Sequence, residues 1–221
     1  MKNIKALQLL FVCLVTVVCF TVNAQPFAEE IAAFKKADAV KFPPKNAILF
    51  VGSSSFRMWT NVQDDFPGYT IINRGFGGSS LPDMIRYIND IIVPYQPKQI
   101  VIYCGDNDLA ASDTVTAQMV VDRFKTLFTG IRKRLGNVPI AYVSIKPSPS
   151  RVKLMPKMMQ ANNMIKDYLT KKNKAAFIDV YHAMVDADNK PMPDIFKEDN
   201  LHMNAKGYAI WQKTIEPYLI K

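Results

Sequence analysis

A run of three serines follows a short apolar segment, and a histidine with a nearby carboxylate lies much later in the chain. The serines follow Gly52 in Gly52-Ser-Ser-Ser55, directly after four apolar residues. A serine hydroxyl becomes a nucleophile only when a base removes its proton and a third group orients that base. His202 can serve as the base, and Asp199, three residues before it, can accept a hydrogen bond from its ring. These residue types predict acyl transfer through a serine.

Acyl transfer also needs hydrogen-bond donors where negative charge develops on the carbonyl oxygen. Three groups of the chain could be such donors. One is the backbone N–H of the nucleophilic serine itself. Another is Gly78, in a glycine-rich segment, and the third is the side-chain amide of Asn107, in Gly105-Asp-Asn-Asp108. Each follows an apolar run, so all three are expected at the ends of strands.

Apolar runs rich in Ile and Val predict buried parallel strands. There are five such runs: Ala47–Val51, Tyr69–Ile72, Gln99–Cys104, Ile140–Ile145 and Ala176–Val180. Apolar residues at helical spacing lie before, between and after them. The predicted helices are Phe27–Phe42, Val115–Leu135, Met155–Leu169 and Ala205–Tyr218. This alternation predicts a flavodoxin-like three-layer α/β/α sandwich with a five-stranded parallel sheet, whose carboxyl edge gathers the candidate residues.

Taken in order, these blocks resemble the SGNH hydrolases, the GDSL-like lipase and esterase family named for Ser, Gly, Asn and His in four blocks. The resemblance runs from about residue 48 to residue 217 and implies a role for each matched residue. Ser54 would be the nucleophile, Asp199 and His202 the orienting acid and the base, and Ser54, Gly78 and Asn107 the oxyanion donors.

One position departs from the family pattern. Ser53 stands where the family commonly has the aspartate of Gly-Asp-Ser, a residue regarded as a loop organiser. The substitution affects the expected organisation of the loop more than the expected reaction class. It also means that experiment must exclude Ser53 and Ser55 as nucleophiles. The segment is not the Gly-x-Ser-x-Gly elbow of α/β-hydrolases, because Phe56 occupies its last position.

The first residues have the composition of a secretory signal peptide. Met1–Ala24 carries two lysines, then the apolar run Leu7–Val22, and ends on a small residue. We expect cleavage after Ala24 and export to the periplasm or the medium, with no stable membrane span afterwards, although the run is nearly long enough to remain as an anchor. Residues 25–221 are expected to form one SGNH hydrolase domain.

Composition narrows the possible partners. The formal net charge of the 221 residues is +9, yet no basic run interleaved with aromatic residues argues for nucleic acid. Cys104 is the only cysteine after Ala24, so no internal disulfide is expected, and its place at the end of an apolar strand suggests a buried thiol. Neither histidine has a recognised metal spacing, so no metal or other cofactor is expected. The oligomeric state is left open.

The predicted function is hydrolysis of carboxylic esters, with short acyl groups favoured because no long insertion looks like a lid. Acetyl esters of glycans or related small molecules are the leading substrate class. The alternatives are a lysophospholipase or thioesterase-type acyl hydrolase, and a non-catalytic flavodoxin-like module that binds phosphate or FMN. His182 is interpreted as structural. Candidates for binding the rest of the substrate are Arg57, Trp59, Arg74, Lys146 and Arg151.

Overall fold

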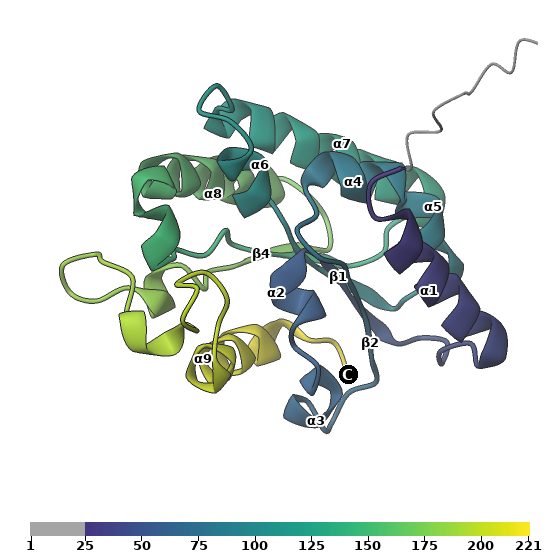
Figure 1. Ribbon diagram of the computed structural model, residues 1–221. Coiled ribbons are helices and arrows are strands. Elements are labelled where there is room, and N and C mark those ends of the chain that lie inside the picture. The colour runs from purple at the N-terminus through teal and green to yellow at the C-terminus, as the bar shows by residue number, and fades with distance from the viewer. Residues whose placement is uncertain (1–24) are drawn as a thin grey trace, which may run out of the picture.

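A single parallel β-sheet lies at the centre of the computed structural model, which describes residues 25–221 (Figure 1). The described residues contain five strands: β1 (Ile48–Gly52), β2 (Ile71–Gly75), β3 (Gln99–Tyr103), β4 (Ile140–Val143) and β5 (Ala175–Ile178). All neighbouring pairs are parallel, and the strand order is β2-β1-β3-β4-β5. The predicted flavodoxin-like sandwich is thereby confirmed.

Alternate residues of the strands enter two separate apolar cores, one on each face of the sheet. Leu49, Val51 and Ile102 pack on one face, whereas Phe50 and Tyr103 pack on the other. The central strands β1 and β3 are fully buried along their length. Burial on both faces explains why these strands read as continuous apolar runs rather than as alternating patterns.

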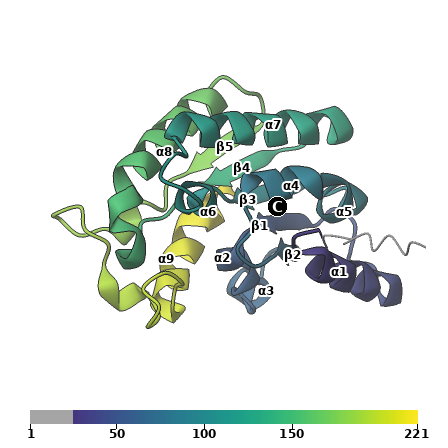
Figure 2. The ribbon, with the colours of Figure 1, turned by 45° about the horizontal axis from the view of Figure 1, so that its top comes forward.

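Helices cover both faces. One face carries α1 (Ala28–Val40), α4 (Leu81–Arg86), α5 (Ile88–Ile91), α7 (Ala117–Leu135) and α8 (Met155–Leu169). The other carries α2 (Ser54–Arg57), α3 (Val62–Asp65) and α9 (Ala205–Ile215). A short helix, α6 (Asp106–Ala110), follows β3 at the edge of the sheet. The rotated view in Figure 2 shows α7 and α8 together on one side of the sheet and α2, α3 and α9 on the other.

The four predicted helices are present, with small differences at their ends. The helix Met155–Leu169 has the predicted bounds, and α9 ends at Ile215, followed by the 3₁₀ turn Glu216–Tyr218. Asn204 caps α9, because its side chain accepts hydrogen bonds from the N–H groups of Lys206 and Gly207. Further 3₁₀ turns are Val93–Tyr95, Pro149–Leu154, His182–Met184 and Pro193–Ile195.

The predicted signal peptide, Met1–Ala24, lies outside the described residues. Among residues 25–221, no helix combines the length and the apolar character that crossing a membrane would require.

Candidate active site

The strand order places a switch point next to β1, because the chain passes from β1 to β2 on one side and then to β3 on the other. Ligands of open α/β sheets bind beyond the carboxyl ends of the strands at such a point. The segments after β1, β2 and β3 carry the three serines, the glycine-rich loop and Asn107, respectively. The topology therefore brings the predicted segments to one edge.

Gly52 lets the chain leave β1 in contact with β3. A Cβ atom at this residue would lie 1.9 Å from the carbonyl oxygen of Tyr103, and φ is +151°. Only glycine tolerates this approach and this backbone conformation. The next residue, Ser53, is extended, and α2 begins at Ser54. The sharp change from strand to helix presents Ser54 at the edge of the sheet.

Burial distinguishes the three consecutive serines. Ser53 is fully buried and Ser55 is 2% exposed, whereas Ser54 is partly exposed. The Ser53 N–H donates to the carbonyl of Tyr103, and the Tyr208 hydroxyl of α9 donates to the carbonyl of Ser55, both of which fix the turn. Ser54 is therefore the serine whose hydroxyl a substrate can reach.

Ser54, His202 and Asp199 form a continuous chain of hydrogen bonds. The Ser54 Oγ lies 2.9 Å from Nε2 of His202, and Nδ1 of the same ring lies 2.6 Å from Oδ2 of Asp199. Ser54 and His202 are 148 residues apart in the sequence. The imidazole thus has one nitrogen on a carboxylate and the other on a hydroxyl, the arrangement that activates a serine for nucleophilic attack.

The carboxylate of Asp199 is held by the turn that also carries His202. Its Oδ1 accepts hydrogen bonds from the backbone N–H groups of Leu201 and His202, both at 2.9 Å. Partial burial raises the pKa of Asp199, but the hydrogen bonds from the His202 ring and from these two N–H groups outweigh it and lower the pKa to about 2. Asp199 is therefore ionised at neutral pH.

The loop after β2 supplies an open backbone donor. Gly78 is exposed and has φ of +67°, a conformation that favours glycine. Within residues 25–221, no group accepts a hydrogen bond from its N–H. Ser79, the next residue, donates from Oγ to the carbonyl of Gly52, which ties this loop to the end of β1. The Gly78 N–H is thus available beside the serine turn.

The amide of Asn107 has a fixed orientation. Its Nδ2 donates to the carbonyl of Ser79 at 3.1 Å, and its Oδ1 accepts from the Arg151 guanidinium at 2.9 Å. An amide nitrogen carries two hydrogens, so one remains for a developing oxyanion. Arg151 also pairs with Asp106 at 3.0 Å, and Asp106 accepts from the Asn107 backbone N–H. Arg151 therefore lies behind Asn107 and orients it.

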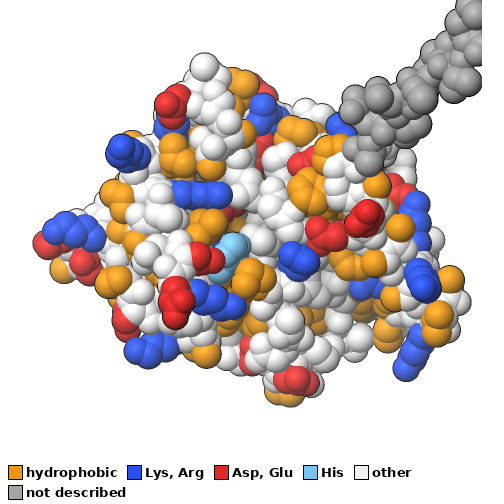
Figure 3. Space-filling view, viewed as in Figure 1, with side chains coloured by type: hydrophobic (Ala, Val, Ile, Leu, Met, Phe, Trp, Pro, Cys, Tyr) orange, Lys and Arg blue, Asp and Glu red, His pale blue; other side chains and the backbone are white. Residues whose placement is uncertain are grey.

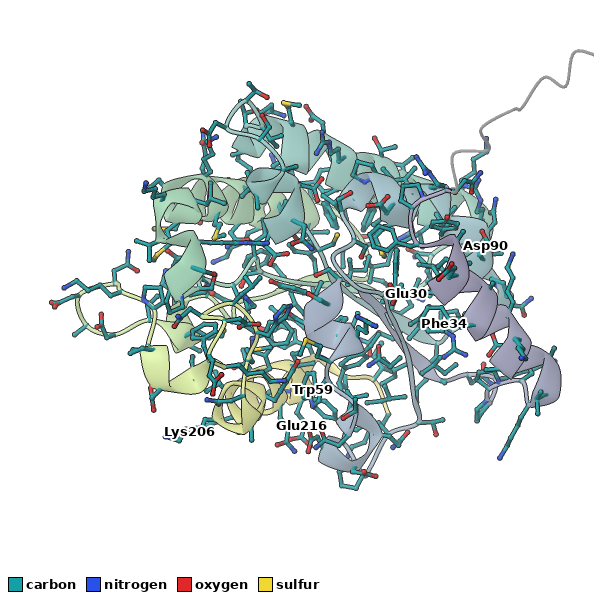
Figure 4. The ribbon with its side chains drawn as sticks, in the orientation of Figure 1. Glu30, Phe34, Trp59, Asp90, Lys206 and Glu216 are labelled. Carbon is teal, nitrogen blue, oxygen red and sulfur yellow. The ribbon has the colours of Figure 1, made fainter. Side chains whose placement is uncertain are left out.

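A contact that the sequence did not predict connects helix α1 to the glycine loop. The Glu30 carboxylate accepts from the Gly77 N–H at 3.1 and 3.3 Å and pairs with Arg57 at 3.0 Å. Figure 4 shows Glu30 on α1, on the side that faces the middle of the molecule. Since 47 residues separate Glu30 from Gly77, no local sequence signal could reveal this contact.

The other proposed substrate-binding residues have different surroundings. Trp59 is fully buried against Phe66, the residue after α3, and against Tyr208 and Trp211 of α9. Figure 4 shows Trp59 between α3 and α9. Arg74 pairs with Asp38 of α1 and donates to the Tyr95 hydroxyl, away from Ser54. Lys146 is 1% exposed and donates to the carbonyl of Leu201. Of the five candidates, only Arg57 has a largely exposed side chain.

His182 also has a carboxylate three residues before it. Its Nδ1 lies 2.7 Å from Oδ2 of Asp179, and its backbone N–H donates to Oδ1 of the same residue. Asp179 and His182 thus repeat the local geometry of Asp199 and His202, so spacing alone does not distinguish the two histidines. The hydrogen bond between His202 and Ser54 distinguishes the two histidines.

The described part of the chain contains no cluster of three or more His, Cys, Asp or Glu side chains that would hold a metal ion. Cys104 is fully buried, and burial raises the pKa of its thiol well above the ordinary value. The expected buried thiol is therefore confirmed.

An open hollow of about 690 Å³ flanks the Asn107 side of the site. It is lined on one side by Leu109, Ala110 and Asp113 and on the other by residues 149–154, Arg151 among them. Figure 3 shows the corresponding face of the molecule, with histidine colour near its middle and basic and acidic side chains around it. Ser54 and His202 are themselves partly exposed and Gly78 is exposed, so the reactive edge is open to solvent.

Three solved structures illustrate the similarity of fold. A protein from Streptococcus pneumonia is 19% identical over 87% of this chain and 92% of its own, with a TM-score of 0.75. A GDSL-like lipase from Bacteroides thetaiotaomicron is 20% identical over 85% of this chain and 95% of its own, with a TM-score of 0.72. An acetyl xylan esterase from Geobacillus stearothermophilus is 14% identical over 81% of this chain and 99% of its own, with a TM-score of 0.64. At these identities the likeness concerns the fold.

The fold is a three-layer α/β/α sandwich with an open edge beyond its strands. Residues 47–210 match the model of the GDSL-like Lipase/Acylhydrolase family, and the chain belongs to this family. The resemblance to SGNH hydrolases is therefore confirmed, and the protein is an ester-cleaving enzyme of that class. Among curated proteins, no sequence matches this chain.

Proposed function

We propose that the protein is a serine esterase in which Ser54 attacks the carbonyl carbon of a carboxylic ester. The observation that carries this proposal is the hydrogen-bonded chain from Ser54 through His202 to Asp199, with distances of 2.9 and 2.6 Å. No other histidine of the chain has such a contact with a serine, since His182 pairs only with Asp179 among the described residues.

The reaction proceeds in two steps. His202 takes the Ser54 proton as the Ser54 oxygen bonds to the carbonyl carbon, and the proton then passes to the departing alcohol. Water next attacks the acyl-enzyme, again with His202 as base, and releases the carboxylic acid. In both steps the N–H groups of Ser54 and Gly78 and the free amide hydrogen of Asn107 stabilise the oxyanion. Asp199, ionised at neutral pH, keeps the imidazole oriented.

The proposed substrates are short acyl esters, acetyl esters in particular, of glycans or related polar alcohols. The reactive edge is open, and polar side chains such as Arg151, Lys153 and Asp113 line the adjacent hollow, which suits a hydroxylated alcohol portion. The Geobacillus stearothermophilus neighbour is described as an acetyl xylan esterase and shares the fold.

A phosphate-binding or FMN-binding module is less consistent with the serine turn. Two of its three hydroxyls, those of Ser53 and Ser55, are on buried residues and do not face a ligand. The turn has one accessible serine, which already bonds to a histidine.

Labelling with a fluorophosphonate probe, followed by peptide mapping, tests the proposal. We expect one modified residue, Ser54, and no labelling of the Ser54→Ala variant. Modification at Ser53 or Ser55, or full ester hydrolysis by Ser54→Ala, would contradict the assignment. Hydrolysis of p-nitrophenyl esters of increasing acyl length tests the substrate class, because a preference for long chains favours a lipase or lysophospholipase. Acetyl release from acetylated xylooligosaccharides tests the glycan assignment directly.

Export is a separate proposal, based on the composition of Met1–Ala24. Sequencing the N-terminus of the protein recovered from the native cell envelope or medium would identify cleavage after Ala24. An intact Met1 in membrane fractions would instead favour a retained anchor.

A further inference from the structure

Lys146 is a buried lysine that contacts the segment carrying the acid and the base. It follows β4 by three residues, and its side chain is 1% exposed. Its Nζ donates a hydrogen bond of 2.7 Å to the carbonyl oxygen of Leu201, and it lies 5.5 Å from the centre of the Phe196 ring. A lysine ammonium is rarely buried unless it is paired, because removing the charge from water is costly.

The carbonyl that Lys146 contacts belongs to the peptide group between Leu201 and His202. The N–H of the same peptide group donates to Oδ1 of Asp199 at 2.9 Å. The other oxygen of Asp199 holds the His202 ring. A single peptide group therefore lies between an ammonium at its oxygen and a carboxylate at its hydrogen. Hydrogen bonds in such a series polarise one another, so the ammonium strengthens the N–H donor that holds Asp199.

Charged groups from three other segments face the Lys146 ammonium. Asp106 of α6 and Asp199 favour its charged form, whereas Arg151 of the turn after β4 disfavours it. Within residues 25–221, none of these carboxylates approaches Nζ closely enough to form an ion pair. The Leu201 carbonyl is therefore the direct partner of the buried charge.

We propose that Lys146 is a positioning residue of the active site, whose ammonium holds the Leu201–His202 peptide and thereby keeps Asp199 and His202 in place beside Ser54. This inference rests on the assignment of Ser54, Asp199 and His202 as the reacting group and its activating pair. Lys146 itself touches neither the nucleophile nor the substrate.

The charge on Lys146 makes this role dependent on pH. Burial lowers the pKa of Lys146 to about 8, because the neutral amine is favoured in the interior. Above this pH Lys146 is neutral and no longer polarises the Leu201–His202 peptide group. Acylation of Ser54 should therefore slow as the pH rises through about 8.

The experiment measures the rate constant for labelling of Ser54 by a fluorophosphonate between pH 6 and pH 10, for the wild type and for Lys146→Met. Methionine nearly matches the volume of lysine but has neither charge nor donor. We expect Lys146→Met to label about 10- to 100-fold more slowly at pH 7, as a small misplacement of reacting groups can cause. Its kcat for p-nitrophenyl acetate should fall similarly, with KM within about twofold, and its rate should lack the decline above pH 8.

Lys213→Met is the matched control, since it removes the same charge from an exposed side chain, on helix α9. It should keep the wild-type rate and pH profile. Labelling of Lys146→Met within twofold of the wild type, or with an unchanged decline above pH 8, would overturn the proposal. A wild-type rate that does not decline above pH 8 would also overturn it, whether or not the variant folds. Failure of the esterase assignment is distinguishable, because Ser54 of the wild type would then not be labelled.

Discussion

Ser53 and Ser54 are adjacent at the end of β1 but have different environments. The Ser54 hydroxyl bonds to His202, whereas the Ser53 hydroxyl is buried and has no hydrogen-bond partner among the described residues. What holds Ser53 is its backbone, through the carbonyl of Tyr103 and the N–H groups of Phe56 and Arg57. The turn is thus organised without the carboxylate that related sequences commonly carry here.

This difference predicts the effect of removing each hydroxyl. In Ser53→Ala we expect kcat/KM within about twofold of the wild type and a free energy of unfolding within about 0.5 kcal/mol, because a buried hydroxyl without a partner stabilises little. Esterase assays and urea denaturation measure both quantities, and Ser54→Ala is the inactive reference. A large loss of activity in Ser53→Ala would mean that its side chain does organise the site.

The buried charge on Lys146 makes the stability of the protein depend on pH. Its pKa is lowered from 10.5 to about 8 in the folded state. Between these values the unfolded chain binds a proton that the folded protein lacks, so the free energy of unfolding rises with pH. Relative to Lys146→Met, the wild type should gain about 3 kcal/mol across this window.

Urea denaturation of both proteins at pH 7.5 to 10.5 measures this difference. The comparison is needed because buried groups such as Cys104 and Tyr142, whose pKa values are raised by burial, act in the opposite direction in both proteins. A difference that does not change with pH would show that the pKa of Lys146 is not lowered in the folded protein.

The resemblance of the ordered blocks was sufficient to predict that Ser54, His202 and Asp199 come together. The parallel strands explain the place of Ser54 at the edge of the sheet, whereas Asp199 and His202 lie in a later loop that follows no strand directly. The ordered blocks were not sufficient to predict the side chains around this group. Trp59 and Arg74 are near the motifs in sequence but point into the core and toward α1. Side-chain direction depends on packing between distant segments, which the local pattern does not contain.

Helix α1 lies before the region that matches the family model, yet its polar side chains contact β2 and the loop after it. Near its C-terminus Asp38 pairs with Arg74 of β2, and near its N-terminus Glu30 holds the Gly77 N–H. Gly77 immediately precedes the proposed donor Gly78. The helix therefore connects the edge strand β2 to the loop that carries this donor.

We expect Glu30→Gln to reduce kcat by about 10-fold or less and to leave KM nearly unchanged, because a less firmly held loop weakens one oxyanion donor without removing it. Glu29→Gln, an exposed neighbour on the same helix, is the matched control and should behave as the wild type. Steady-state kinetics with p-nitrophenyl acetate measures both. An unchanged kcat in Glu30→Gln would show that the loop keeps its geometry without α1.

The long helices were predictable from their apolar period and the strands from continuous apolar runs, whereas the short helices were not predictable. The helices α1, α7, α8 and α9 and four of the strands appear close to their predicted places, whereas β2 is shifted from the predicted Tyr69–Ile72 to Ile71–Gly75. Helices α2 to α6 have only four to six residues each, too few for an apolar period to repeat. They form because tertiary contacts and caps stabilise them, such as the capping box between Ser80 and Asp83 at the start of α4.

At the scale of the whole molecule, the two apolar cores and the reactive edge meet where β1 contacts β3. Gly52 lies at this point, with the carbonyl of Tyr103 in the space that a Cβ atom would need. A side chain here would separate the two central strands and move Ser54 at the same time. The position thus links the stability of the sheet to the geometry of the site.

Gly52→Ala should therefore destabilise the protein by about 3 kcal/mol or more and abolish most esterase activity, since overpacking and an unfavourable φ act together. Gly68→Ala is the control, because a Cβ there meets no atom within 4 Å. Thermal denaturation monitored by circular dichroism compares the two. Equal melting temperatures for Gly52→Ala and the wild type would contradict the packing described for β1 and β3.

Asp199 and His202 lie in a loop whose two ends are joined by hydrogen bonds. An antiparallel bridge joins Phe196 to Met203, and within it the Lys197 N–H donates to the carbonyl of His202. Asp199 and His202 therefore belong to one segment and move together. A shift of this segment changes the separation of His202 Nε2 from the Ser54 oxygen but keeps the contact between the Asp199 carboxylate and the ring. The proposed reaction therefore depends on how this segment is placed relative to the serine turn, more than on the contact within the segment.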